Sequence, residues 1–163
     1  MIVERGKTLT FKLGYSTYAL KMLDPFKAIQ LIREVGYEAL EICLSNGWPT
    51  SPLCFPPVKQ TTLQKLCEDL GFPSPIFFGN IDICAPSHVR KAMIDLTLKK
   101  FEMVNRLHFD NSPIMLSTTL GPSAPPWASG KEQIKDDCLS LAEMAAEHNV
   151  VLGIEAHAGT DFE

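Results

Sequence analysis

Short apolar runs and longer amphipathic segments alternate along this chain. The apolar runs lie at 11–18, 37–43, 75–83, 113–118 and 150–155. After each of the first four runs comes a segment in which apolar residues recur every three or four positions. The runs have the length of buried strands, and the segments have the period of helices with one buried face. The pattern therefore predicts five strands that alternate with four helices.

Local signals mark where these helices begin and end. Asp24 followed by Pro25 combines an N-cap residue with a proline at the first helical position, and Gly36 can adopt the left-handed conformation that ends a helix. The remaining helices are expected over 58–70, over 87–107 with Ser87 as its cap, and from about 131 to 148.

The order of these elements points to a parallel sheet. Continuous apolar strands that alternate with amphipathic helices are typical of a parallel sheet covered by helices. The first strand leads into residues 17–21, which lack the glycine-rich turn of nucleotide-binding open sheets. We therefore expect an α/β fold with the architecture of a parallel (β/α) barrel. A complete TIM barrel has eight strands, and this chain would supply the first five of them, that is, a partial barrel. Because an unpaired last strand would leave an exposed sheet edge, a fragment or truncated product is expected.

Composition narrows the class of protein. The chain has 163 residues, of which 45% are hydrophobic and 21% charged, as in one globular domain. A net charge of −4 disfavours nucleic acid as a partner. No apolar stretch has the length of a signal peptide or a membrane span, so we expect no membrane association and a cytoplasmic location. Residues 1–10 are interpreted as an N-terminal leader and residues 11–163 as the barrel domain.

The five cysteines do not indicate a metal or redox motif. They are scattered, odd in number and without C-x-x-C spacing, so reduced thiols are expected.

Candidate chemistry lies where the predicted strands end, because active sites of such barrels lie at the carboxyl ends of their strands. Glu41 lies late in the second strand and Asn80 late in the third. Glu155 follows an uncharged run, so its carboxylate should face the barrel mouth or be balanced by a cation such as a divalent metal. His157, two residues on, would share its face if the strand continues. The alternative is that Glu155 and His157 lie on an exposed turn.

Two tryptophans fall in loops on the same side of the predicted sheet. Trp48 follows the second strand and Trp127 the fourth. Each could stack on the ring of a bound ligand, or could pack as a plug within its loop.

Three segments, taken in order, resemble a known family. They are LGYS at 13–16, VGYEALEI at 35–42 and LGIEAHAG at 152–159, and they are similar to the xylose-isomerase-like superfamily of sugar-phosphate isomerases and epimerases. The resemblance implies that Glu155 is a catalytic residue and the first ligand of a divalent metal, Mn, Mg or Zn. It also implies that His157 and Glu41 face the substrate. The remaining ligands, an Asp, a His and a second Glu, would come from three later strands beyond residue 163, so this chain alone is expected to be inactive.

The leading hypothesis is a metal-dependent isomerase or epimerase scaffold for a small sugar or sugar phosphate. One alternative is a non-catalytic half-barrel that forms a homo-oligomer by covering its open edge. Another is an apurinic-site endonuclease, which needs histidine ligands at the ends of earlier strands. This chain offers Asn80, Asp82, Ser117 and Thr118 there, which disfavours the endonuclease.

Overall fold

The computed structural model describes residues 11–155, and the leader expected at 1–10 lies outside them. Five parallel strands form one sheet in the order β1-β2-β3-β4-β5. The strands are β1 (Gly14–Ser16), β2 (Ala39–Cys43), β3 (Ile76–Phe78), β4 (Ile114–Thr118) and β5 (Val150–Ile154). The helices are η1 (Thr17–Leu20), α1 (Pro25–Val35), α2 (Pro57–Asp69), α3 (Ser87–Leu107) and α4 (Trp127–Glu147). The predicted five-stranded parallel part of a TIM barrel is confirmed.

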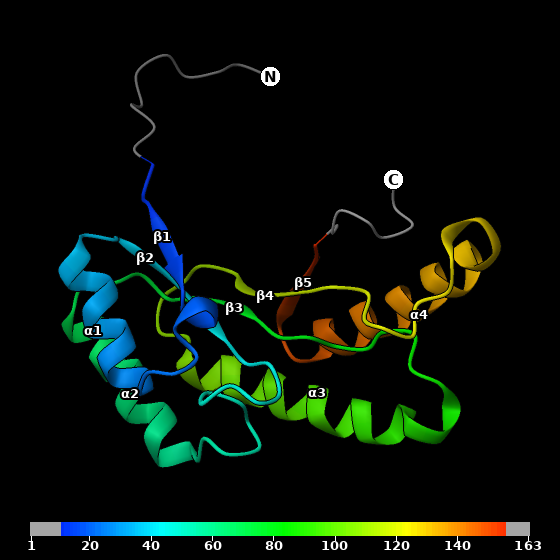
Figure 1. Cartoon of the computed structure of the whole chain (residues 1–163), viewed down its shortest axis with the longest axis horizontal. Coiled ribbons are helices and arrows are strands. Elements are labelled where there is room, and N and C mark those ends of the chain that lie inside the picture. The colour runs from blue at the N-terminus through cyan, green and yellow to red at the C-terminus, as the bar shows by residue number, and fades with distance from the viewer. Residues whose placement is uncertain (1–10, 156–163) are drawn as a thin grey trace.

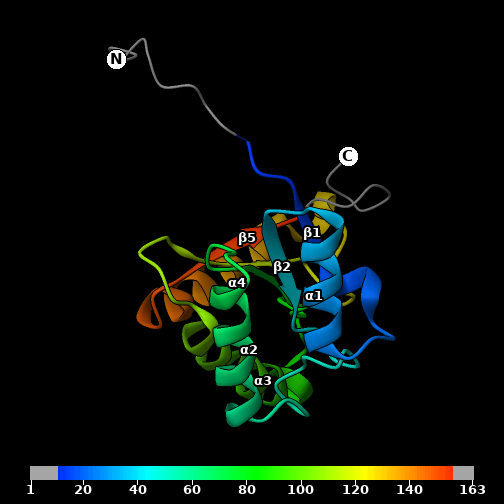
Figure 2. The same ribbon diagram turned by 90° about the vertical axis from the view of Figure 1, so that its left-hand side faces the viewer.

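The α-helices lie along one face of the sheet (Figures 1 and 2). Strand register aligns Ile42 with Phe77 and Phe77 with Leu116, and all three side chains are fully buried. They belong to a core shared with the helices, to which Leu63 and Phe101 contribute. Burying side chains of this size stabilises the fold by about 1.5–3 kcal/mol each. The apolar runs of the sequence thus become the contact between sheet and helices.

The opposite face of the sheet carries a different set of side chains. Register places Glu41 beside Ile76, and Met115 beside Val151. Ile76, Met115 and Val151 are 50%, 42% and 49% exposed. These exposed side chains leave this face open over the described part of the chain. Among residues 11–155, β1 and β5 each pair with one strand, so both edges of the described sheet are open as well.

The first helix forms as its signals predict. Asp24 Oδ1 accepts hydrogen bonds from the N–H groups of Phe26 and Lys27 at 3.1 and 3.3 Å, and Gly36 ends the helix with φ of +103°.

None of the described helices combines the length and the apolar character that crossing a membrane requires.

Some predicted boundaries were wrong. Ser87 does not cap α3; it is the first helical residue, and Pro86 before it makes no side-chain cap bond. Helix α4 begins at Trp127, four residues earlier than expected, because Pro126 supplies its N-cap and Gly130 fits directly against the ring of Pro125. The run at 75–83 gives only a three-residue strand, although Ile81 and Ile83 beyond it are still buried.

Hydroxyl groups fix the backbone where the strands end. Thr17 Oγ1 accepts from the N–H of Cys43 at 2.9 Å, and Ser45 Oγ accepts from the N–H of Asn80 at 3.2 Å. Thr118 Oγ1 accepts from the N–H of Ile81 at 2.9 Å. Cys43 lies beyond the pairing of β2 with β1, and Asn80 and Ile81 lie beyond β3, so each bond satisfies a backbone donor on a side where the strand ladder has ended. We call these three side-chain contacts the strand-exit braces.

A lysine lies in the buried stripe of α3. Lys100 is 1% exposed, its side chain passes Gly79, and its ammonium donates a hydrogen bond to the backbone carbonyl of Asn80. Burial lowers its pKa from the ordinary 10.5 to about 8, an effect that the nearby Cys43 partly opposes. The folded chain therefore holds this proton less tightly than the unfolded chain does.

We predict that Lys100 makes stability rise with pH. Between about pH 8 and 10.5 the unfolded chain keeps a proton at Lys100 that the folded chain has lost, so the contribution of Lys100 to the free energy of unfolding should increase across this window. Burial raises the pKa of Cys67 to about 12 and that of Cys84 to about 11, and these thiols act in the opposite direction, so the effect of Lys100 is measured as the difference from Lys100→Met. Relative to that variant, the wild-type chain should gain roughly 3 kcal/mol over the window. Urea unfolding of both chains at a series of pH values measures the difference. Exposed Lys99, changed to Met, should follow the pH dependence of the wild type, and parallel curves for the wild type and Lys100→Met would contradict the assignment.

Two left-handed glycines offer a second test. Gly36 and Gly121 have φ of +103° and +87°, but a Cβ on Gly36 would meet nothing within 4 Å, whereas on Gly121 it would lie 2.5 Å from Asp82 Cα. Gly36→Ala should therefore cost only the backbone strain, about 1–2 kcal/mol. Gly121→Ala should cost about 1–3 kcal/mol more through overpacking. Equal losses in urea unfolding would show that the loop containing Gly121 moves away freely.

Candidate functional site

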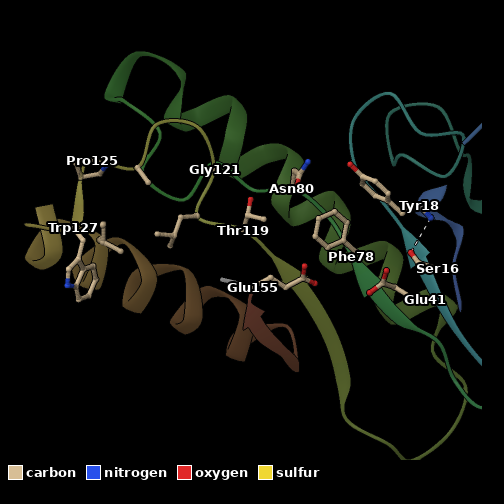
Figure 3. A pocket seen from close by; sticks show the side chains of 13 residues that line it. Ser16, Tyr18, Glu41, Phe78, Asn80, Thr119, Gly121, Pro125, Trp127 and Glu155 are labelled. Atoms are coloured by element: carbon tan, nitrogen blue, oxygen red, sulfur yellow. Dashed lines mark hydrogen bonds between the residues drawn. The ribbon is translucent and has the colours of Figure 1, made fainter. Parts of the chain in front are cut away.

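A pocket of about 710 Å³ lies at the carboxyl ends of the strands (Figure 3). This volume is within the range of small-molecule sites. The pocket is lined by Ser16, Tyr18, Glu41, Phe78, Asn80, Thr119, Leu120, Gly121, Ala124, Pro125, Trp127, Ile134 and Glu155. It thus brings together four of the residues expected from the sequence, namely Glu41, Asn80, Trp127 and Glu155.

Two carboxylates, from β2 and from the end of β5, form one part of the lining (Figure 3). The backbone N–H of Glu155 donates to the carbonyl of Thr118 at 2.8 Å, which extends the pairing of β4 and β5 by one residue. The carboxylate of Glu155 accepts a hydrogen bond from Ser117 Oγ at 2.7 Å. Glu41 lies beside Ser16 in the register of β1 and β2. The ends of strands that are not neighbours therefore direct acidic groups to one pocket.

The pKa of Glu41 is raised above its ordinary value of 4.5. Burial is the largest cause, a hydrogen bond with the Ser16 side chain opposes it, and the negative charge of Glu155 raises it further. The last contribution shows that the two carboxylates interact electrostatically. Like charges that share a partly buried site favour the protonated form of one partner.

Aromatic rings form much of the apolar lining. Phe78, from β3, meets the ring of Tyr18 edge-on with a centroid distance of 5.7 Å. Trp127 lies farther along the pocket beside Pro125 (Figure 3). The sequence placed Trp127 in a loop, but it is the first residue of α4, and its side chain is 42% exposed.

Trp48 lies behind the pocket lining. Its ring packs on Tyr18 at a centroid distance of 4.8 Å, and its Nε1 donates to the Tyr18 carbonyl at 3.0 Å. The ammonium of Lys21 lies 4.1 Å from the centre of the Trp48 ring. Trp48 is therefore not among the residues that line the pocket, and its contact with a sugar stays a prediction. Tyr18, in η1, takes the lining position, and only its place at the end of the first predicted strand could have indicated this.

Asn80 reaches the pocket from a firmly held backbone. Its N–H is bound by the Ser45 brace, and its carbonyl accepts from the buried Lys100. His157 lies outside the described residues, so its role remains a prediction.

The described residues do not complete a metal site. Between residues 11 and 155 no group of three His, Cys, Asp or Glu side chains could hold a metal ion. Glu41 and Glu155 are the carboxylates of the pocket, and fewer than three protein ligands fall short of a catalytic zinc site. A catalytic zinc ion at Glu155 would therefore need further protein ligands from outside this range.

The segment at 119–125 contributes five lining residues that the sequence did not indicate. It has no helical or strand period, and its glycine and prolines predict only a loop. Its role becomes visible only when the segment is folded against the residues that follow β3.

Comparisons with known proteins agree with this architecture. No family model matches the chain, and no curated protein matches it significantly. A crystal structure of D-psicose 3-epimerase in the presence of D-fructose superposes with a TM-score of 0.69 at 15% identity, covering 94% of this chain and 55% of that one. A D-tagatose 3-epimerase-like protein superposes with a TM-score of 0.60, also at 15% identity, covering 92% and 55%.

The chain thus spans about half the length of these solved structures. At this level of identity the likeness concerns the fold alone, and it confirms the barrel fold expected from the sequence. The chain has the fold of the first five strands of a TIM barrel, and it shares this part with the two epimerase structures.

Proposed function

We propose that this chain forms the sugar-binding part of an isomerase or epimerase that acts on a neutral monosaccharide. The observation that carries the proposal is the convergence of Glu41 and Glu155, from β2 and β5, on one pocket at the carboxyl ends of the strands. The epimerase fold of the two solved structures supports the same class of reaction.

The chemistry of such a reaction suits a pair of carboxyl groups. Epimerisation beside a carbonyl requires that a proton leave one carbon and that a proton return to it. Glu155, held through Ser117, is the group we assign to proton removal. Glu41, whose pKa is raised, can carry a proton at higher pH than an ordinary glutamate, and it is the group we assign to the return of a proton to the carbon.

The rest of the lining suits the two kinds of surface that a sugar presents. The rings of Phe78, Tyr18 and Trp127 can pack against its C–H groups, and the amide of Asn80 can bind its hydroxyls. Trp48 would act indirectly by holding Tyr18.

Charge favours a neutral sugar over a phosphorylated one. The described pocket lining includes two glutamates and no lysine, arginine or histidine. Phosphate recognition generally uses cationic side chains, and two carboxylates would repel the dianion. The metal dependence implied by the family resemblance would require ligands outside residues 11–155, and the roles given to Glu41 and Glu155 do not depend on it.

A second candidate function is a half-barrel that acts through self-association. The exposed apolar side chains Ile76, Met115 and Val151 on the open face of the sheet favour it. A chain that dimerises through this face and binds no sugar would support this candidate over the first.

We predict that the negative charge of Glu155 raises the midpoint at which Glu41 titrates. The midpoint for Glu41, followed by ¹³C NMR of its carboxyl carbon, should lie above 4.5. Glu155→Gln should lower that midpoint, because the substitution removes a nearby negative charge. The exposed Glu34 on α1 provides the control, since Glu34→Gln should leave the midpoint unchanged. An unchanged midpoint in Glu155→Gln would mean that the two groups do not share a pocket.

Ligand binding tests the substrate class. In saturation-transfer NMR, D-fructose should bind to the chain and D-fructose 6-phosphate should bind more weakly. Glu155→Gln should weaken fructose binding by roughly tenfold to a hundredfold, as expected for a lost charged hydrogen bond, whereas Glu34→Gln should have no effect. Stronger binding of the phosphate would overturn the neutral-sugar assignment.

A further inference from the structure

The loops that leave β3 and β4 are joined by one carboxylate. Asp82 Oδ1 accepts a hydrogen bond from the N–H of Ser123 at 3.0 Å, and Asp82 Oδ2 accepts one from Ser123 Oγ at 2.6 Å. A single aspartate thus holds both the backbone and the side chain of one serine. We call this pair of bonds the Asp82–Ser123 clamp.

Close packing reinforces the clamp on both sides. The N–H of Ile83 donates to the carbonyl of Leu120 at 3.1 Å. At Gly121 a Cβ would lie 2.6 Å from Asp82 Oδ1, so the loop backbone directly contacts the carboxylate. Farther on, Gly130 of α4 packs against Pro125 so closely that a Cβ there would lie 2.2 Å from Pro125 Cγ. The segment between these contacts has little room to move.

This segment forms one wall of the pocket. Leu120, Gly121, Ala124 and Pro125 line the cavity, and Trp127 follows at the start of α4 (Figure 3). Asp82 itself is not among the lining residues, and both of its carboxylate oxygens are occupied by Ser123. Any effect of Asp82 on a ligand must therefore pass through the wall.

We propose that Asp82 is a positioning residue that holds one wall of the pocket by clamping Ser123, and so contributes to discrimination between sugars of different size. The ligand class rests on the proposed function, whereas the clamp rests on the contacts alone. Asp82 lies near the end of the third predicted strand, where a catalytic or ligating role would ordinarily be sought. Its hydrogen bonds give it a structural partner instead.

Size selection provides a readout that loss of stability alone would not change. Binding of D-fructose is compared with binding of lactulose, a ketose disaccharide, by saturation-transfer NMR. The wild-type chain should favour fructose. In Asp82→Ala the released wall should admit the larger sugar, so the ratio of the two affinities should shift toward lactulose by about tenfold. Asp82→Asn, which can still accept from the Ser123 N–H, should restore much of the wild-type ratio.

A second readout does not need a ligand. Trp127 becomes the sole tryptophan in a Trp48→Phe background, because the chain has two. Acrylamide should quench its fluorescence more strongly once Asp82→Ala frees the wall. Ser123→Ala, which removes one bond of the clamp, should act in the same direction and keeps the test valid if Asp82→Ala does not fold. Asp95→Ala removes an exposed carboxylate from α3 and should change neither readout.

The outcomes separate the clamp from the proposed function. Unchanged quenching and an unchanged affinity ratio in both clamp variants would overturn the role of Asp82. If neither sugar binds to the wild-type chain, the proposed function fails, and quenching alone decides whether the clamp holds the wall. Adding Ser123→Ala to Asp82→Ala should cause little further change, because the two residues act as one unit.

Discussion

Burial of one side of each strand against the helices is the constraint on which the site depends. Ile42, Phe77 and Leu116 are aligned across three strands and have no exposed surface. Because side chains alternate between the faces of a strand, a shift of one residue would move each of these apolar groups out of the core. The same alternation assigns Glu41 and Ser117 to the other face. The position of the acidic groups is thus a consequence of hydrophobic packing on the opposite side of the sheet.

The fold could be predicted from the sequence because its signals are local and periodic. Asp24, Pro25 and Gly36 specify one helix by caps that act within a few residues. The alternation of short apolar runs with amphipathic helices indicates a parallel sheet. The prediction was wrong where a boundary depends on tertiary contacts. Helix α4 starts early because Gly130 accommodates Pro125, and the apolar run after Phe78 stays buried without remaining in the ladder.

The site was predictable only in part, for a related reason. Glu41, Asn80 and Glu155 could be identified as pocket residues because they lie near the carboxyl ends of predicted strands that meet at one edge. The order of residues could not reveal that Tyr18 would lie between Trp48 and the pocket, since this depends on how two loops pack. The wall at 119–125 could not be recognised either, because its shape is determined by Asp82, some forty residues earlier. Side chains that act through long-range contacts leave no period in the sequence.

The strand-exit braces hold the ends of the strands in place independently of the loops that follow them. Thr17, Ser45 and Thr118 each hold a neighbouring strand end with a side-chain oxygen from the adjacent strand exit, so these ends stay in place without help from the loop tips. Loop sequences could then diverge, lengthen or be exchanged while the carboxylates keep their spacing. A scaffold of this kind can acquire a new ligand preference by changing its loops, with the framework that holds its carboxylates left intact.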